Sequence, residues 1–327
     1  MADIDNMKKK VLSGDPVALG KAITLIESKK DEDRLTANQL LSEILSQTGN
    51  SLRIGITGVP GVGKSTFIDT LGELITSQGK KLAVLAIDPS SPQSKGSILG
   101  DKTRMSKLAG NQNAFIRPSA SGGNLGGVAS NTMDSILLCE AAGYDVVLIE
   151  TVGVGQSEVA VKNMTDVFLL LMLAGAGDEL QGIKRGIMEM ADILVINKAD
   201  GDNIANANLA RKAYENALHL FSPRETGWSP PVLTCSSISG KGVENVWYQV
   251  NEYAESISKN GELKNIREEQ KKHWLESMLS AEVMDHIQKD KQLQPILTKL
   301  EKEVLKGNLT PQQAVQDILN AFFGRQG

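Results

Sequence analysis

The pattern of apolar and polar residues divides the chain into three regions. In residues 1–50, apolar side chains recur at helical spacing among polar ones, which predicts two amphipathic helices. The residues that set this spacing are Val17, Leu19, Ile23, Leu25 and Ile26, then Leu35, Leu40, Leu41, Ile44 and Leu45. Residues 256–327 return to a charged, helical pattern. Each flank is therefore interpreted as a helical segment.

The middle region, residues 51–255, consists of short apolar runs separated by helical stretches. Runs of this length, rich in Val, Ile and Leu, are typical of parallel strands that are buried on both faces of a sheet. They cover residues 52–57, 82–87, 145–149, 167–172, 193–196 and 232–233. The predicted fold class is α/β, with a mostly parallel central sheet flanked by helices and with helical extensions at both ends.

The last helix of the C-terminal segment is marked by its first residues. Thr310 and Gln313 match a capping box, and Pro311 occupies the first helical position. Its apolar face ends in Phe322 and Phe323. That face either packs on its own domain or forms a dimerisation arm, because an apolar surface of this kind needs a cover. The pattern alone leaves both possibilities open.

Charge, apolar runs and cysteine content indicate which kinds of partner and location are expected. The 35 Lys and Arg against 39 Asp and Glu give a net charge of −4 without a long block of one sign, which argues against nucleic acid. The longest apolar run, 167–176, is about half of what a membrane-spanning helix needs. The first residues lack an apolar secretory segment, and the two cysteines, Cys139 and Cys235, form no CxxC pair. We therefore expect a cytoplasmic protein with no membrane or nucleic-acid partner.

A complete phosphate-binding motif follows the first apolar run. The segment Gly58-Val59-Pro60-Gly61-Val62-Gly63-Lys64-Ser65 matches GxxxxGK[ST], and Thr66 continues it into a helical pattern. Glycines let the backbone amides point at phosphate oxygens, and the helix that follows adds the positive end of its dipole. We expect Lys64 to bridge the β- and γ-phosphates and Ser65 to bind Mg²⁺. The middle region is thus predicted to be a P-loop NTPase domain.

Further metal ligands are expected at strand ends. Asp88 follows the run 82–87 and Glu150 follows the run 145–149, so both should emerge at the carboxyl edge of the sheet, where open α/β folds bind ligands. Asp101 lies in a polar stretch and is a weaker candidate by position alone.

Asn197-Lys198-Ala199-Asp200 matches NKxD directly after an apolar run. A carboxylate accepts two hydrogen bonds side by side, and guanine offers two adjacent donors, whereas adenine presents an acceptor at its ring nitrogen. Asp200 therefore predicts GTP over ATP, with Asn197 and Lys198 bracing the loop and covering the base. Ser236 and Ser237 follow the last apolar run, where GTPases place a loop against the guanine carbonyl.

The residues expected to govern hydrolysis differ from the usual GTPase pattern. Glu150-Thr151-Val152-Gly153 resembles the DxxG switch, but Val154 stands where Ras-like enzymes place the glutamine that orients water. Slow intrinsic hydrolysis and a group supplied from elsewhere are therefore expected. The glycine-rich stretch 175–186 contains Lys184 among several charged candidates. Lys64, Glu150 and Lys184 are the predicted catalytic residues.

With these motifs in place, the chain resembles the MeaB/ArgK family of methylmalonyl-CoA mutase-associated GTPases, the bacterial relatives of human MMAA, in the SIMIBI class. The matching segments are GITGVPGVGKST at 55–66, AIDPSSP at 86–92, GDKTRM at 100–105, ETVGVGQSE at 150–158, AGAGDELQGIKRGIMEMAD at 174–192 and NKAD at 197–200. The resemblance covers most of residues 52–239; the flanking helices match in arrangement only.

The resemblance implies a homodimeric, Mg²⁺-dependent GTPase that acts as a chaperone for an adenosylcobalamin-dependent acyl-CoA mutase and is stimulated by it. It implies metal surroundings built from Ser65, Asp88, Asp101 and Glu150, a nucleotide-responsive loop at 175–186, and a dimer contact in the C-terminal helices. The rival readings are a nickel-type metal-insertion GTPase, for which Cys and His clusters are missing from the sequence, and a small-molecule kinase or transport ATPase, against which Asp200 argues.

Overall fold

The computed structural model describes residues 2–28, 30–87, 105–118, 125–151, 157–175, 185–221 and 227–324. By contact density the chain separates into two compact units, Met1–Lys271 and Lys272–Gly327. The first unit contains the sheet together with the N-terminal helices. The division into segments 1–50, 51–255 and 256–327 remains a prediction, because these two units do not test it.

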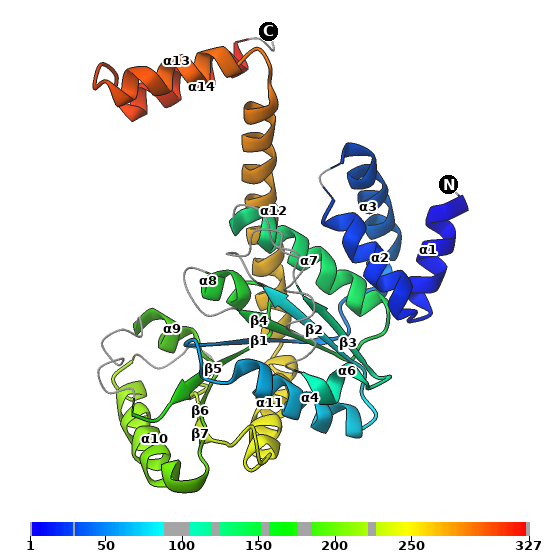
Figure 1. Cartoon of the computed structure of the whole chain (residues 1–327), viewed down its shortest axis with the longest axis vertical. Helices are drawn as coiled ribbons and strands as arrows, with labels where there is room; N and C mark the ends of the chain where they lie inside the picture. The colour runs from blue at the N-terminus through cyan, green and yellow to red at the C-terminus, as the bar shows by residue number, and fades with distance from the viewer. Residues whose placement is uncertain are drawn as a thin grey trace. The chain divides into compact units, whose positions relative to one another are not determined.

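Among the described residues, a seven-stranded sheet forms the centre of the first unit (Figure 1). Its strands are β1 (Leu52–Gly58), β2 (Leu82–Ile87), β3 (Ala114–Pro118), β4 (Val146–Thr151), β5 (Val167–Leu173), β6 (Ile193–Asn197) and β7 (Val232–Thr234). They lie in the order β3-β2-β4-β1-β5-β6-β7, and every neighbouring pair is parallel. All carboxyl ends therefore meet at one edge, with β1 in the middle. This confirms the predicted α/β fold class.

The edge strand β3 was absent from the sequence prediction. Its residues Phe115, Ile116 and Arg117 form a short, partly polar run, and Pro118 ends it. A strand at the edge has one neighbour only, so it needs less apolar sequence than the strands in the middle. The other six strands coincide with the predicted apolar runs to within two residues at either end.

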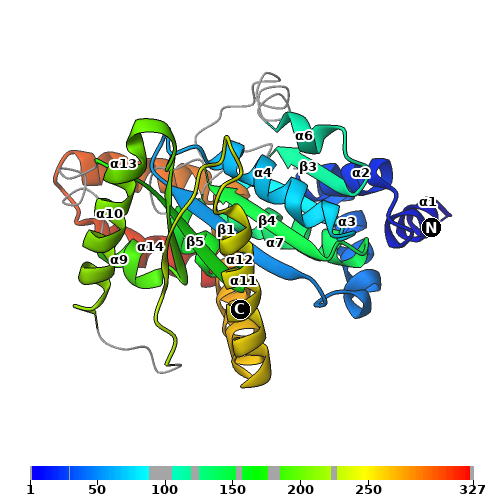
Figure 2. The ribbon, with the colours of Figure 1, turned by 90° about the horizontal axis from the view of Figure 1, so that it is seen from below.

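Helices cover both faces of the sheet. On one face, α4 (Lys64–Ser77) packs beside α6 (Ser106–Ala109) and α11 (Val243–Lys259). On the other, α7 (Leu125–Ala141) packs beside α8 (Ser157–Lys162), which contacts α9 (Arg185–Met190). Figure 2, seen from below, shows α4 and α11 in front of the sheet. After β6, η2 (Gly201–Asn203) leads into α10 (Ile204–Leu218), which contacts β6 and β7. The five inner strands between these layers are almost completely buried, which explains their continuous apolar sequence.

The N-terminal region contains three α-helices rather than the predicted two: α1 (Ala2–Leu12), α2 (Pro16–Ile26) and α3 (Asp31–Ile44), followed by the short η1 (Leu45–Gln47). α1 escaped prediction because its apolar residues are few, although Val11 is fully buried. Val17, Leu35 and Leu45 were expected on apolar faces and are instead exposed. Helical spacing identifies a helix, but the side that is covered depends on where the helix packs, here against α7.

Charged side chains are paired at the amino edge of the sheet. Arg53, at the start of β1, donates from Nε and from one guanidinium NH₂ to the Glu140 carboxylate at 2.8 and 3.0 Å, and both side chains are almost fully buried. Next to this pair, the Asp166 carboxylate accepts the Arg53 amide at 2.9 Å and two Arg267 donors at 2.9 and 2.7 Å. We call these four residues the amino-edge ion network.

The second unit is helical and buries little apolar surface within itself. It contains the later part of α12 (Glu262–Lys289), then α13 (Gln294–Leu305) and α14 (Pro311–Phe323). The predicted capping box of Thr310 and Gln313 is present, with Pro311 at the start of α14. Ala314 is the buried residue of α14, and the rings of Phe322 and Phe323 pack edge to face at 5.2 Å. Among the helices described, none is long and apolar enough to cross a membrane.

Candidate nucleotide site

The segment 58–65, called the P-loop below, runs from the end of β1 to the start of α4 at the carboxyl edge of the sheet. Gly58 has a φ of 152°, and a Cβ at this position would lie 2.4 Å from the Leu171 carbonyl oxygen on β5. Gly63 has a φ of 93°, and a Cβ there would lie 2.9 Å from Asn197 Nδ2. Only glycine fits either position without displacing its neighbours. Both glycines are therefore explained by close packing as well as by the turn.

The first turn of α4 receives no side-chain cap from any described residue. The first amides of a helix carry the positive end of its dipole and need an acceptor. In the same turn, the Lys64 ammonium is largely buried and donates to the Gly58 carbonyl at 2.9 Å and the Val59 carbonyl at 3.4 Å. The combination of helix amides and one buried ammonium suits a phosphate group.

Two carboxylates influence the charge of that ammonium. Burial lowers the pKa of Lys64, and the charges of Glu150 and Glu158 act against this effect. Glu150 lies near the end of β4, beside Ile56 of β1, and Glu158 lies in the first turn of α8. Both carboxylates are buried, at 7% and 8% exposure. Glu158 was not among the predicted site residues, because no spacing rule links it to Lys64.

An oxygen-rich corner lies beside the lysine. The Ser65 hydroxyl donates to Glu150 Oε1 at 3.1 Å, and the Thr57 and Thr151 hydroxyls share a 2.8 Å hydrogen bond. Hydroxyl and carboxylate oxygens at the start of a P-loop helix are the donor set that Mg²⁺ prefers. The residues present thus fit the metal. Asp88 and Asp101, the other predicted ligands, lie outside the described residues, as does Lys184.

The predicted base-reading residues form a second, adjoining cluster. Asn197 ends β6 and is 1% exposed. Its Nδ2 donates to the Val62 carbonyl of the P-loop at 2.9 Å, and its Oδ1 accepts from the Ser237 hydroxyl at 2.7 Å and the Ser237 amide at 3.2 Å. One side chain therefore joins the P-loop to the loop after β7. This arrangement fixes the distance between a phosphate-binding and a base-binding element.

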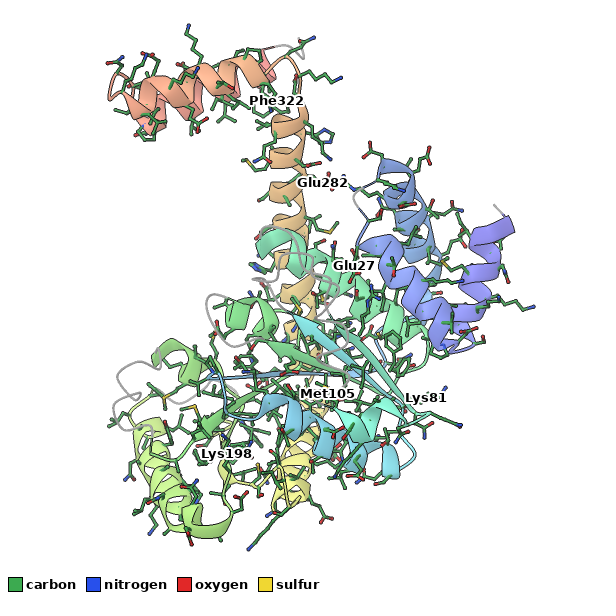
Figure 3. All side chains as sticks on the ribbon, viewed as in Figure 1. Glu27, Lys81, Met105, Lys198, Glu282 and Phe322 are labelled. Atoms are coloured by element: carbon green, nitrogen blue, oxygen red, sulfur yellow. The ribbon has the colours of Figure 1, made fainter. Side chains whose placement is uncertain are left out.

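Asp200 belongs to the same cluster through Ser236, whose hydroxyl donates to Asp200 Oδ2. Ser236 also accepts the Ser239 amide at 3.2 Å, so the loop is held in one shape. Lys198 has a φ of 58°, the single left-handed non-glycine residue in the part of the chain described, and its carbonyl accepts from Asn203 Nδ2 at 2.8 Å. Figure 3 labels Lys198 at the end of β6, the same edge as the P-loop, and Lys81 ahead of β2 at the opposite edge.

A buried thiol completes the base cluster and was not predicted. Cys235 Sγ lies 3.5 Å from Asn197 Oδ1, and the Ala199 amide donates to the Cys235 carbonyl at 2.9 Å. Burial, and secondarily the charge of Asp200, raises the pKa of Cys235 to about 12, so the thiol keeps its proton and acts as a donor. A lone cysteine in a sequence gives no sign of such a contact.

Comparison with known proteins places this site in a family. The model of the family described as methylmalonyl Co-A mutase-associated GTPase MeaB matches residues 19–292. The chain belongs to the MeaB family. It is therefore a GTPase, and the motif-based recognition is confirmed.

Similar proteins agree with this assignment. A probable GTPase of Mycobacterium tuberculosis is 48% identical over 316 residues, covering 97% of this MeaB-family chain and 94% of that protein. The GTPase ArgK of Escherichia coli is 47% identical over 279 residues, covering 85% and 84%. The mitochondrial methylmalonic aciduria type A homolog of Mus musculus is 43% identical over 332 residues, covering 98% and 80%.

A solved structure extends the likeness to the whole fold. The crystal structure of a LAO/AO transport system kinase superposes with a TM-score of 0.78 at 36% identity, covering 98% of both chains.

Proposed function

We propose that this chain is a Mg²⁺-dependent GTPase that acts as a chaperone for an adenosylcobalamin-dependent acyl-CoA mutase, with methylmalonyl-CoA mutase as the leading candidate. In this role it gates loading of the cobalamin cofactor and protects the mutase. The observation that carries the nucleotide part is the Asn197 side chain, which bonds the P-loop to the base-reading loop. The family description carries the mutase part.

In this proposal GTP is bound at two points. The amides of the P-loop and of the first turn of α4 hold the phosphates, with Lys64 placed against the β- and γ-phosphates. Asp200 accepts the two adjacent guanine donors, while Ser236 keeps its carboxylate oriented. Asn197, Lys198 and Ser237 shape the base pocket.

Ser65 and Glu150 would hold the magnesium ion, together with Asp88 and Asp101. A Mg²⁺ ion held by these residues would supply positive charge to the phosphates. Ser65 donates to Glu150 and directly follows Lys64, whose ammonium is acted on by the Glu150 charge, so the positive charge that the phosphates need lies near the proposed metal ligands. GDP and phosphate are the products.

We assign slow intrinsic turnover to the residue after the switch motif, Val154, which has no group to orient water. Lys184 then completes the site when the mutase is bound. The test is GTP turnover of Lys184→Ala with the mutase present. A reduced stimulated rate with an intact basal rate supports the role, whereas an unchanged stimulated rate removes Lys184 from the mechanism.

We also propose a cytoplasmic homodimer that pairs through its C-terminal helices. The support is the exposure of large apolar side chains there: Leu275 and Leu279 on α12 are 68% and 63% exposed, and Phe323 on α14 is 59% exposed. Apolar surface of this extent needs a cover in water. Light scattering of Leu275→Glu/Leu279→Glu tests this: a monomer is expected, and an unchanged dimer would contradict it.

The guanine assignment is tested by replacing one carboxylate oxygen of Asp200 with an amide nitrogen. Asp200→Asn replaces an acceptor by a donor, which suits the 2-oxo group of xanthine and not the 2-amino group of guanine. We expect GTP affinity to fall about 10²-fold or more and XTP affinity to rise, as measured by calorimetry. Asp202→Asn, an exposed neighbour in η2, is the matched control and should leave both affinities unchanged. ATP bound as tightly as GTP by the natural chain would overturn the assignment.

The chaperone role is tested separately. Purified cobalamin-dependent acyl-CoA mutases are passed over the immobilised chain with GTP or GDP, and GTP turnover is measured with and without each. Nucleotide-dependent binding and faster turnover are expected with one of them. If none binds or stimulates, the chaperone role fails while the GTPase stands.

A further inference from the structure

The short helix α8 contacts elements at both ends that are far apart in the sequence. Its first turn carries Glu158, whose charge acts on Lys64 of the P-loop. Val161, near the end of α8, and Thr165, in the turn that follows, lie against β1: a Cβ on Gly55 would lie 2.6 Å from Val161 Cγ1 and 3.0 Å from Thr165 Oγ1. Val161 and Thr165 are buried. A displacement of α8 along its axis would therefore change the packing against β1 directly beneath the P-loop.

The turn after α8 is bonded to α12. Gln270 Nε2 donates to the Thr165 carbonyl at 2.8 Å, and Arg267 donates to both Asp166 oxygens. Arg267 also donates to the carbonyls of Gly49 and Ser51, just before β1. Thr165 itself is held to α8 through its hydroxyl, which donates to the Val161 carbonyl at 2.9 Å. Two side chains of α12 thus hold the turn that follows α8.

One of these contacts is incomplete. Gln270 is 5% exposed, and its Oε1 is buried without a hydrogen-bond partner, as is Trp274 Nε1 one turn later on the same helix. Buried polar atoms without partners cost free energy, and a leucine at position 270 would avoid that cost. A glutamine with one satisfied and one unsatisfied end is suited to an element that exchanges between two hydrogen-bonded arrangements.

We propose that α8 is a connector through which the phosphate site and α12 influence each other. Val161 is its contact with β1 beneath the P-loop, Glu158 is the charge in its first turn that acts on Lys64, and Gln270 and Arg267 are the partners on α12 of the turn that follows it. The proposal rests on the nucleotide binding proposed above and adds where nucleotide occupancy is transmitted. When phosphates draw the Lys64 ammonium toward themselves, Glu158 loses its counter-charge, α8 shifts, and the Thr165–Gln270 bond is exchanged. By linkage, changes at Gln270 must in turn alter nucleotide affinity.

The test is amide hydrogen exchange on the full chain, free, with GDP and with a non-hydrolysable GTP analogue. Peptides covering 58–66 report on the P-loop and peptides covering 262–275 report on α12. In the natural chain both should respond, and α12 should differ between the two nucleotides. In Gln270→Leu the P-loop response should persist while the α12 difference disappears. The ratio of analogue to GDP affinity should change about fivefold, a small value for coupled sites.

Three further variants keep this test decisive. Gln270→Met serves if Gln270→Leu does not fold. Glu158→Gln breaks the opposite end of α8 and should abolish the same α12 difference. Gln249→Leu, which removes a glutamine that donates to Glu252 on α11, is the matched control and should behave as the natural chain.

Identical α12 exchange in all three states, or a Gln270→Leu chain that responds normally, overturns the connector. A P-loop that does not respond to either nucleotide overturns the proposed function, and the connector with it.

Discussion

At one edge of the sheet, buried charges are held by ion pairs, and at the other a buried ammonium is held by backbone carbonyls. At the amino edge, the ion network of Arg53, Glu140, Asp166 and Arg267 pairs buried carboxylates with guanidinium groups that bond in two places. At the carboxyl edge, the buried Lys64 ammonium is held by two backbone carbonyls and by the more distant charges of Glu150 and Glu158. Strand β1 links the two edges: Arg53 lies near its start, and Gly58, whose carbonyl accepts from Lys64, ends it.

The difference teaches what each edge is for. Fixed pairs at 2.7 to 3.0 Å satisfy the charges within the protein, so the amino edge contributes to holding the fold together. A lysine whose pKa is lowered by burial and partly restored by carboxylates is poised for an anion that supplies stronger partners. Stability and binding are therefore separable by mutation.

The largest expected effect is on stability, at the amino edge. Arg53→Met leaves the Glu140 carboxylate buried without its guanidinium, and we expect the free energy of unfolding to fall by about 3 to 5 kcal/mol in urea titrations. GTP affinity of the remaining folded protein should be unchanged. Lys259→Met breaks an ion pair that is 77% and 68% exposed and should cost less than about 1 kcal/mol. A small loss in Arg53→Met would erase the contrast between the edges.

The carboxyl edge should show the reverse behaviour. Lys64→Ala removes the ammonium that faces developing phosphate charge, and we expect GTP turnover to fall by about 10² to 10³-fold in a phosphate-release assay. Thermal stability should be equal or higher, because a buried charge is lost. Lys107→Ala, at a half-exposed ion pair with Glu73, is the control and should keep full turnover. Strong destabilisation in Lys64→Ala would mean that this edge, too, serves the fold.

Asp134 sharpens the comparison because it lies on α7, the same helix as Glu140, where burial alone raises its pKa from 3.8 to about 7. The folded state then keeps a proton that the unfolded chain releases, so stability should fall as pH rises from about 4 to about 7 and level off above that. Asp134→Asn should remove this slope, worth on the order of 3 kcal/mol, in urea titrations at pH 5 and 8.

One control belongs to this measurement. Asp317→Asn changes an exposed aspartate on α14 and should leave the pH dependence as it is. A slope that survives in Asp134→Asn would assign the pH dependence to other groups.

The smallest effect separates the two buried cysteines. Cys235→Ala removes a donor to Asn197 Oδ1, and we expect GTP affinity to weaken about fivefold, equal to about 1 kcal/mol, by calorimetry. Cys139→Ala makes a similar cavity in α7, away from the base cluster, and should lower stability without changing affinity. Equal affinities in both variants would show that the thiol contact does not support the base loop.

The central fold follows from the sequence because local pattern and tertiary environment agree there. Continuous apolar sequences such as 146–149 are buried on both faces, so the pattern alone identifies them. β3 and α1 escaped because an edge strand and a mostly polar helix carry weak patterns. The exposure of Leu35 was not predictable, since periodicity does not say which neighbour a helix meets.

The site divides in the same manner. The P-loop follows β1 and Asn197 ends β6, and each motif could be placed after a strand from the sequence. Because parallel strands end at the same edge of the sheet, the two motifs meet there, and Asn197 bonds to the P-loop. The contacts of Glu158, Cys235 and Arg267 were invisible because they join segments that are distant along the chain. A short-range pattern carries no information on such pairs.

Both thiols of the chain are buried, and burial raises the pKa of each. Reagents that attack thiolates should therefore not react with the natural cysteines of the folded protein. A single introduced cysteine, for example Ile238→Cys at a side chain that is 81% exposed beside the base loop, would take up a fluorescent dye without any background substitution. The chain thus comes ready for site-specific optical reporters of nucleotide exchange.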